Sequence, residues 1–569
     1  MPTKIGTMFS SQPRSPRTFD RRTFFRGALL VGLGTGAAAT VAACSESSML
    51  GGSVKNDAQP QPKGFDQPAR PLPIPPLEEG EVKDGTRVIK LTAAASSAEL
   101  LAGKKTNTWG YSADFLGPTL RAKRGEKMRV EVTNDLQEMT TVHWHGVKLP
   151  AAADGGPHTT IEPGEVWKAK FTVDQPAASV WYHPHPHERT ALHCYRGLAG
   201  MFIIDDDISK QLDIPNEYGV DDIPVVVVDA KFHDNGELDE NIDPTLGLKG
   251  DTPLVNGIAH AELEAQATRL RLRLLNGAGM RFYTFALSNK APLQVIATDA
   301  GLLDAPVEVD EVLMGPGERV EVVIDLTPGE DVVLESVPRE DNFGIPKDDN
   351  AVDFGFRDHF EILKIKVPQE LDEPSGSLPE TLDPAAADTP AIEGLKSRDF
   401  VLNTFMINGE HMDMNRVDIT IDHKEPEVWT VTNENSDWPH NFHIHNCRFK
   451  VLELNQVDTD VNVQTVGWKD TVDLPPKATA KLLVDFGWFP DPTVPYMYHC
   501  HMLLHEDNGM MGQFVMVNPG DKADVPHVEH GGTRGHGNHA NPTTPATGAE
   551  GSSGAKGNPG GHQKNLSVN

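Results

Sequence analysis

The segment Met128-Arg129-Val130-Glu131-Val132-Thr133-Asn134 alternates apolar and polar side chains and ends in an asparagine. Alternation with a period of two is typical of a β-strand that buries one face. The pattern recurs as Leu270-Arg271-Leu272-Arg273-Leu274-Leu275-Asn276 and as Glu427-Val428-Trp429-Thr430-Val431-Thr432-Asn433. Each copy follows a Gly-containing turn, so one strand unit occurs three times in the chain.

The three copies lie about 130–160 residues apart, and no long segment shows helical periodicity. This spacing predicts an all-β protein of three related domains, most simply Greek-key β-sandwiches. We expect these domains at 85–210, 211–368 and 396–520, with an Asp-, Glu- and Pro-rich linker at 369–395. Residues 521–569 lack the apolar content for a core, and we expect a disordered, His-containing tail there.

The first 44 residues are typical of a targeting segment. A basic stretch containing Arg21-Arg22 resembles a twin-arginine export signal, and a short, Gly-interrupted apolar run follows it. Val41-Ala42-Ala43-Cys44 resembles a bacterial lipobox, so we expect Cys44 to carry a membrane-anchoring lipid; cleavage without lipidation is the alternative. Residues 45–84 are rich in Pro, Ser and Gln and predict a flexible tether. The protein is thus expected on the extracytoplasmic face of the cell envelope.

Composition excludes several classes of protein. Of the 569 residues, 82 are Asp or Glu and 51 are Lys or Arg, which gives a formal net charge of −31. Such a chain is a poor nucleic-acid binder, because neutralising phosphates requires a basic surface. A hydrophobic fraction of 38% suits globular cores and not a multi-span membrane protein. The 4 Cys are too few for a disulfide framework.

The 23 histidines are not scattered evenly. Roughly one His-x-His pair is expected by chance in a chain of this composition. The sequence has many more, all in the first and third repeats: His143-Trp144-His145, His183-Pro184-His185, His185-Pro186-His187, His443-Ile444-His445 and His499-Cys500-His501. In a strand, such a pair places two imidazoles on one face. Pairs from two domains can therefore enclose metal ions, with copper, zinc, iron and nickel as candidates.

The last pair favours copper. Alternation turns the Cys500 thiol away from its two neighbours, and His505, Met510 and the upstream His440 are available on that side. Two His, one thiolate and a weak Met form the ligand set of a blue copper electron-transfer centre. Cys500 would then lie only a few covalent bonds from a His-only cluster, on the order of 10 Å at ~3.3 Å per residue.

Four motifs in order resemble those of the multicopper oxidases: His-Trp-His-Gly from 143, Trp-Tyr-His-Pro-His from 181, His-Asn-Phe-His-Ile-His from 440, and His-Cys-His-Met-Leu-Leu-His from 499. The resemblance covers about residues 85–518 and is strongest to the bacterial copper efflux oxidases. It implies three cupredoxin-like domains, the second without copper ligands, and four copper ions. The first domain, 85–210, and the third, 396–520, would hold them.

The resemblance also assigns the ligands residue by residue. It implies a blue copper at His440, Cys500, His505 and Met510, and a normal copper at His143 and His443. It implies a coupled copper pair at His145, His183, His185, His445, His499 and His501. Asp154 and Glu506 match family carboxylates that deliver protons to oxygen; orienting a ligand imidazole is an alternative role for each. One departure, Asn441 in place of a common Pro, is expected to leave the ligands untouched.

The implied activity is one-electron oxidation of a reducing substrate coupled to reduction of O2 to water. We expect Cu(I) oxidation in copper tolerance, with laccase-like oxidation of phenols as the alternative, by a monomer. Residues 359–400 contain no Met, unlike the Met-rich insertion of copper efflux oxidases. Met406, His411, Met412 and Met414 offer a smaller soft-ligand cluster, although turn and core roles are favoured. A degenerate scaffold, such as the family's cell-division relatives, is disfavoured because all ligand positions are filled.

Two cysteines and the tail histidines have no firm role. Cys194 and Cys447 lie near ligands in domains expected to meet, so an interdomain disulfide and buried free thiols are both possible interpretations. The tail contains His527, His530, His536, His539 and His562, for which solvation is favoured over metal collection.

Overall fold

The computed structural model describes residues 68–347, 352–371, 378–455 and 463–528. The expected export signal, Cys44 and most of the His-containing tail lie outside these residues. Within them the regular secondary structure is mostly β-strand, and the three α-helices are short: α1 (Ala151–Asp154), α2 (Thr190–Tyr195) and α3 (Leu503–Asp507). No helix in these ranges is long and apolar enough to cross a membrane.

The first sandwich packs two sheets around a core that contains Trp144, Tyr182 and Phe202. One sheet has the order β2 (Leu77–Glu78), β6 (Thr119–Lys123), β11 (Gly200–Asp205), β10 (Ala178–His183) and β8 (His143–His145). The other has the order β3 (Glu81–Lys83), β4 (Thr86–Leu101), β7 (Lys127–Asn134) and β9 (Val166–Thr172), with β5 (Lys104–Tyr111) paired to β4.

The second sandwich is built in the same way around its own apolar core. One sheet has the order β1 (Arg70–Pro71), β14 (Ala261–Glu264), β22 (Phe360–Lys366), β21 (Val332–Ser336), β16 (Tyr283–Leu287) and β19 (Val312–Met314). The other has the order β13 (Thr252–Val255), β12 (Asp222–Ala230), β15 (Arg269–Asn276), β20 (Arg319–Asp325), β17 (Leu293–Thr298) and β18 (Gly301–Val309).

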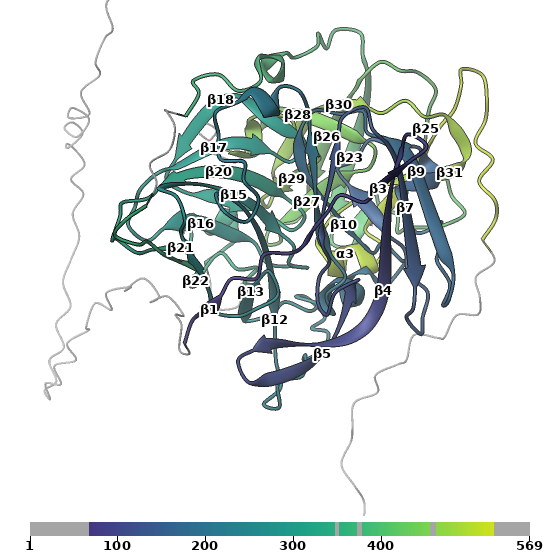
Figure 1. Cartoon of the computed structure of the whole chain (residues 1–569). Helices are drawn as coiled ribbons and strands as arrows, with labels where there is room; N and C mark the ends of the chain where they lie inside the picture. Colours follow the sequence, from purple (N-terminus) through teal and green to yellow (C-terminus); the bar gives the residue numbers. More distant parts are fainter. Residues whose placement is uncertain (1–67, 348–351, 372–377, 456–462, 529–569) are drawn as a thin grey trace, which may run out of the picture. The chain divides into compact units, whose positions relative to one another are not determined.

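The third sandwich carries the Cys500 motif, and Cys500 belongs to its core. One sheet has the order β24 (Met406–Ile407), β23 (Lys396–Asn403), β26 (Glu427–Asn433), β30 (Thr479–Phe486) and β28 (Cys447–Leu454). The other has the order β25 (Ile419–Ile421), β32 (Met511–Met516), β31 (Asp491–His499), β27 (His440–Ile444) and β29 (Thr471–Leu474). Most of these strands are labelled in Figure 1. The expectation of an all-β fold of three sandwiches is confirmed.

The repeated asparagine has the same role in each sandwich. Asn134, Asn276 and Asn433 end β7, β15 and β26, and all three side chains are fully buried. In each case the side-chain oxygen accepts the N–H two residues later, and the amide donates to carbonyl oxygens of other loops. An Asx turn is a local substitute for a backbone turn. The Asn is therefore repeated because it ends a strand and fixes the loop that follows.

The structure corrects the expected tether for residues 68–84. β1 pairs with β14 of the second sandwich, and β2 pairs with β6 of the first. The Arg70 guanidinium donates to the carbonyl oxygens of Glu99 and Leu100, at 2.9 and 2.6 Å. The Pro-rich composition was misleading because β1 and β2 lie at sheet edges, where a residue without an N–H is tolerated. This segment thus contacts two sandwiches.

The beginning of the expected tail is also attached to the third sandwich. The Asp524 N–H donates to the Pro492 carbonyl, and the Val528 N–H donates to the Asn415 side chain. The part of the tail up to residue 528 is therefore held by hydrogen bonds and was wrongly expected to be disordered. In the linker, the buried Leu382 donates its N–H to Asp304, and a 3₁₀ turn (Pro384–Ala387) follows.

Truncation tests whether residues 68–84 belong to the fold. We expect a chain that begins at residue 85 to unfold at a temperature lower by about 5 °C or more, because it loses two edge strands and the Arg70 hydrogen bonds, worth roughly 1 kcal/mol each. A chain that begins at residue 68 is the matched control and should unfold like a chain that begins at residue 45. If calorimetry gave equal unfolding temperatures for the chains that begin at residues 68 and 85, residues 68–84 would not contribute to the stability of the fold.

Candidate metal centre

Four strands from two sandwiches bring eight histidines together. In the first sandwich, β8 and β10 pair antiparallel with His143 opposite His183. In the third, β27 and β31 pair antiparallel with His443 opposite His499. The side chains are at most 1% exposed: His143, His145, His183, His185, His443, His445, His499 and His501. Figure 1 labels β10 and β27, which carry residues of this cluster.

The two sandwiches meet ring against ring in this cluster. His143 stacks on His445 and His145 stacks on His443, each with ring centroids 3.7 Å apart. The Nε2 atom of His499 lies 3.2 Å from that of His185 and 3.3 Å from that of His445. Neighbouring imidazole nitrogens therefore converge from domains that are far apart in sequence.

In most of these rings one nitrogen already donates to the protein. Carbonyl oxygens can only accept, so Nδ1 is the donor in His143 to Asp154, His183 to Pro184, His443 to Asp470 and His499 to Cys500, at 2.8–3.2 Å. The second nitrogen then carries a lone pair. Among the described residues, Nε2 of His143 and of His443 has no hydrogen-bond partner. Buried lone pairs without a donor are what a metal ion requires.

Burial also keeps the rings neutral. It lowers the pKa of His183 to about 3 and that of His185 to about 4. It also lowers the pKa of five further histidines of the cluster: His143, His145, His443, His445 and His501. A neutral imidazole is the form that binds metal. The cluster is therefore suited to a cation at physiological pH without prior loss of protons.

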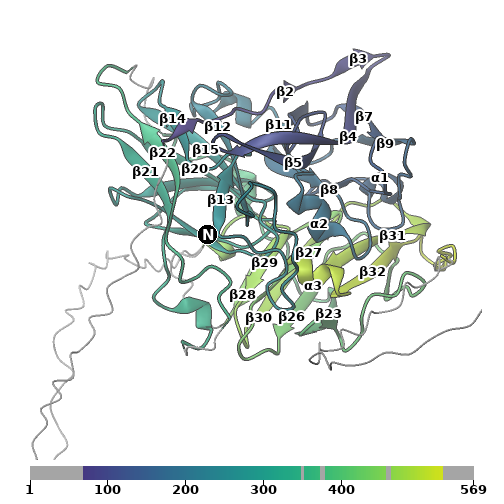
Figure 2. The ribbon, with the colours of Figure 1, turned by 90° about the horizontal axis from the view of Figure 1, so that it is seen from below.

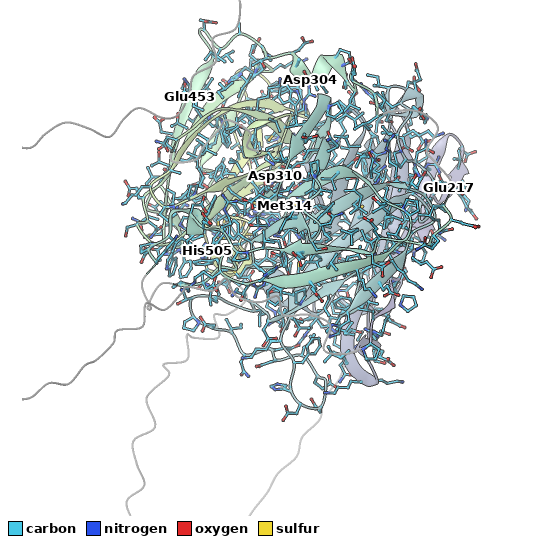
Figure 3. The ribbon with its side chains drawn as sticks, turned by 90° about the vertical axis from the view of Figure 1, so that its left-hand side faces the viewer. Glu217, Asp304, Asp310, Met314, Glu453 and His505 are labelled. Atoms are coloured by element: carbon cyan, nitrogen blue, oxygen red, sulfur yellow. The ribbon has the colours of Figure 1, made fainter. Side chains whose placement is uncertain are left out.

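Cys500 belongs to a separate cluster from its two neighbours, as strand alternation predicts. Its Sγ lies 3.7 Å from His440 Nδ1 and 3.5 Å from His505 Nδ1, and those two nitrogens are 3.1 Å apart. His440 Nε2 donates to the Asn435 side-chain oxygen at 2.8 Å, which leaves Nδ1 as the ligand atom. The fourth expected ligand, Met510, is fully buried, and its backbone oxygen accepts from the Cys500 N–H. His505 is labelled in Figure 3.

The donor set of this second cluster fits a soft metal. Burial raises the pKa of the Cys500 thiol to about 12, so the free thiol stays protonated. A bound cation removes such a proton. Thiolate, two imidazoles and a thioether are the set that copper accepts in electron-transfer sites, and all four residues are fully buried.

The two expected carboxylates lie against the histidine cluster. Asp154, in α1, places Oδ2 2.7 Å from His445 Nδ1, and burial raises its pKa well above the ordinary value. Glu506, in α3, places its two oxygens 3.3 Å from His185 Nδ1 and 3.2 Å from His499 Nδ1. α3 lies beside α2 of the first sandwich (Figure 2). Each carboxylate thus touches rings that point into the cluster.

Two further residues touch the ligands, and their contacts were not predicted. Asp470 accepts from His145 Nε2 at 3.0 Å and is itself paired with Arg319 of the second sandwich. Asn441, expected to leave the ligands untouched, accepts the His501 N–H at 2.7 Å and lies 3.5 Å from the Cys500 sulfur, while His440, Cys500 and His505 still converge. The charged run Lys469-Asp470 beside a strand was the available signal, although such runs are usually solvated.

The remaining cysteines carry free thiols. Cys194 and Cys447 are buried and unpaired with each other, so of the two interpretations the free thiol holds within the described chain. Cys447 donates to the Ile444 carbonyl at 3.4 Å, while Cys194 lies in α2. Burial raises the pKa of both thiols well above the ordinary value, which makes them unreactive.

Comparison with known proteins agrees with this geometry. Three multicopper oxidase domain profiles match residues 92–209, 237–331 and 384–520. A multicopper oxidase of Staphylococcus haemolyticus is 35% identical over 78% of this chain and 91% of its own length. The cell division protein FtsP of Yersinia pestis is also 35% identical, over 78% of this chain and 92% of its own.

A solved structure extends the likeness to the fold. The laccase-like multicopper oxidase CueO of an Ochrobactrum species, described as active towards lignin model compounds and lignosulfonate, is 34% identical. It superposes with a TM-score of 0.69 over 79% of this chain and 100% of its own. The family's reaction requires copper ions, O2 and a reducing substrate, and the buried histidine clusters provide sites that suit such ions. The chain belongs to the multicopper oxidase family and is an oxidoreductase.

Proposed function

We propose that this chain binds four copper ions and couples one-electron oxidation of a substrate to reduction of O2 to water. The blue copper would be held by His440, Cys500, His505 and Met510, and the normal copper by His143 and His443. The coupled pair would be held by His145, His183, His185, His445, His499 and His501. The convergence of buried, neutral imidazole lone pairs between two sandwiches is the observation that carries this proposal.

Copper, when bound, supplies the one-electron chemistry; the chain supplies its arrangement. His499, Cys500 and His501 are consecutive, so the thiolate ligand is joined by covalent bonds to two residues of the histidine cluster. All three side chains are at most 1% exposed, which excludes water from this connection. A rigid, dry connection keeps reorganisation small when charge moves.

Asp154 and Glu506 are proposed to deliver protons to the cluster. Reduction of O2 to water consumes as many protons as electrons, and both carboxylates are almost fully buried against ligand imidazoles. Burial raises the pKa of Asp154 well above its ordinary value, which favours a carboxyl group that can hold a proton, and its Oδ2 lies 2.7 Å from His445 Nδ1. The same contact orients the His445 ring, and the two roles are compatible.

Replacing Cys500 tests the blue copper assignment. Cys500→Ser should abolish the blue absorption and reduce oxidase turnover by at least about a thousandfold, because the hydroxyl is not a ligand for copper of this type. Cys447→Ser is the matched control: Cys447 is also a buried core thiol, it donates to the Ile444 backbone carbonyl, and the variant should keep both properties. Oxidase turnover retained by Cys500→Ser would refute the proposed route of electrons.

For the substrate, we propose Cu(I), with a role in copper tolerance. The Phe405 and Trp438 rings pack against His505 at 5.3 and 5.6 Å. Beside them the exposed His411 bonds the Asn508 carbonyl through Nδ1, and the half-buried Met412 bonds the Gly509 carbonyl through its N–H. The His411 imidazole thus borders the loop that joins His505 to Met510, and the next residue, Met412, carries a thioether, a soft ligand of the kind that selects Cu(I).

Phenol oxidation is the second candidate. The aromatic cover of Phe405 and Trp438 over His505 favours it, because stacked rings receive a planar substrate. A non-enzymatic role like that suggested by the name of the cell division relative is disfavoured, since every expected ligand position is filled and buried.

Comparison of two substrates separates the two candidates. For the copper-loaded protein we expect faster turnover of Cu(I) than of a methoxyphenol. The double variant His411→Ala with Met412→Leu should lower Cu(I) turnover about tenfold and leave phenol turnover unchanged. The reason is that the loop beside His505 loses the imidazole and the thioether that would bind Cu(I). His233→Ala, an exposed histidine of the second sandwich, is the control. Fast phenol oxidation without Cu(I) turnover would contradict the proposed role in copper tolerance.

We further propose that the protein is exported and anchored by lipid at Cys44. The twin-arginine-like Arg21-Arg22 and the lipobox-like Val41-Ala42-Ala43-Cys44 support this location, and export of a folded chain suits an enzyme loaded with metal.

The mature N-terminus tests the anchor. Mass spectrometry of protein purified from the membrane fraction should give an N-terminal residue Cys44 with a diacylglycerol modification. Cys44→Ser should move the protein from the membrane to the soluble fraction, because a lipid anchor contributes ~0.8 kcal/mol per buried CH2 group. An unmodified N-terminus at Cys44 or beyond would show that the segment is a plain secretory signal.

A further inference from the structure

The second sandwich reaches the histidine cluster through one buried arginine. Arg319 begins β20, and its side chain is 0% exposed. All five of its N–H groups are used: two bond the two oxygens of Asp470 at 2.9 and 2.5 Å. The other three bond the carbonyl oxygens of Ser179, Gly317 and Asp299 at 2.8–3.0 Å. A guanidinium with every donor satisfied holds one position and fixes its carboxylate partner.

Asp470 uses this fixed position to hold two imidazoles of the cluster. Its Oδ1 accepts from His145 Nε2 at 3.0 Å, and its backbone carbonyl accepts from His443 Nδ1 at 2.9 Å. His145 belongs to the first sandwich and His443 to the third. The two rings are also stacked, with centroids 3.7 Å apart. The Thr471 hydroxyl lies 3.3 Å from the same two nitrogens, but its proton is donated to Asp470 Oδ1 at 3.0 Å. Asp470 is therefore the nearer acceptor for both rings and favours the nitrogen that each offers to a metal.

The two rings offer different nitrogens to a metal. His443 donates through Nδ1 and offers Nε2, as do His143, His183 and His499. His145 donates through Nε2, so only Nδ1 is left, and that atom has no partner among the residues the structure describes. Without an acceptor at Oδ1, His145 would be free to adopt the other tautomer and direct an N–H into the cluster.

We propose that Arg319 and Asp470 are positioning residues of the copper cluster, so that the second sandwich acts on a metal centre to which it contributes no ligand. The inference rests on the proposed function. Arg319 holds Asp470 in place through two N–H donors, one on each carboxylate oxygen, at a position that is 0% exposed. Asp470 in turn holds His145 with Nδ1 directed at the cluster.

The opposing interpretation is that this pair only stabilises the interface between sandwiches. The chain offers a matched comparison, because Arg273 and Asp222 form a second buried pair, with bonds of 2.7 and 2.9 Å, that touches no histidine of the cluster. Both pairs are nearly inaccessible to water. A structural role predicts equal effects when either pair is removed, and a positioning role predicts an effect on copper from one pair alone.

The test replaces each pair as a unit. Removing one partner of a buried pair leaves an unpaired buried charge and is strongly destabilising, whereas replacing both partners by apolar residues is often neutral. We expect Arg319→Met with Asp470→Leu to fold, to keep the blue absorption, and to lose about half of the bound copper together with the near-ultraviolet band of the coupled pair. Arg273→Met with Asp222→Leu should bind copper like the unchanged protein.

Copper content, absorption and electron paramagnetic resonance of the whole chain give the answer. Unchanged copper and spectra in the Arg319/Asp470 double variant, or equal losses in both double variants, would overturn the inference. Arg319→Lys is a second variant, which keeps the charge but not the two-pronged contact with Asp470. We expect full copper content with a shifted near-ultraviolet band of the coupled pair, to which His145 belongs, and an unshifted band also overturns the inference. If the unchanged protein binds no blue copper, the proposed function fails instead.

Discussion

The metal centre depends on one constraint: each buried imidazole must donate its N–H in a hydrogen bond to the protein, so that its other nitrogen keeps a lone pair directed at the cluster. The backbone carbonyls of Asp154, Pro184, Asp470 and Cys500 accept four of these hydrogen bonds. Those carbonyls come from loops and strand ends, whose positions follow from the sandwich fold. The fold therefore positions the hydrogen-bond acceptors of the histidines as well as the histidines themselves.

The ligand positions were accessible from sequence because strand alternation turns a His-x-His pair into two rings on one face. The acceptors were not. Asp470 lies 325 residues from His145 in sequence, and Arg319 lies 151 residues from Asp470. The contacts of Asn441 were inaccessible for the same reason, since its partners are the Cys500 sulfur and the His501 backbone. Contacts that depend on how three sandwiches meet have no local pattern in one sequence.

The fold itself was predicted where the pattern is local and repeated, as in the strands that end at Asn134, Asn276 and Asn433. It was mispredicted where composition suggested disorder. Residues 68–84 contain several prolines, yet β1 and β2 occupy sheet edges that need few N–H donors. Composition describes what a segment could do alone, and these residues are held by two neighbouring sandwiches.

The distribution of ligands along the chain has a consequence for biosynthesis. The first half of the histidine cluster is complete at His185, but the second half ends at His501, near the last strand. A nascent or clipped chain therefore presents only open half-sites, with imidazoles exposed to whichever divalent ion is abundant. The whole site can therefore form only after the chain has been made as far as His501 and the first and third sandwiches have met.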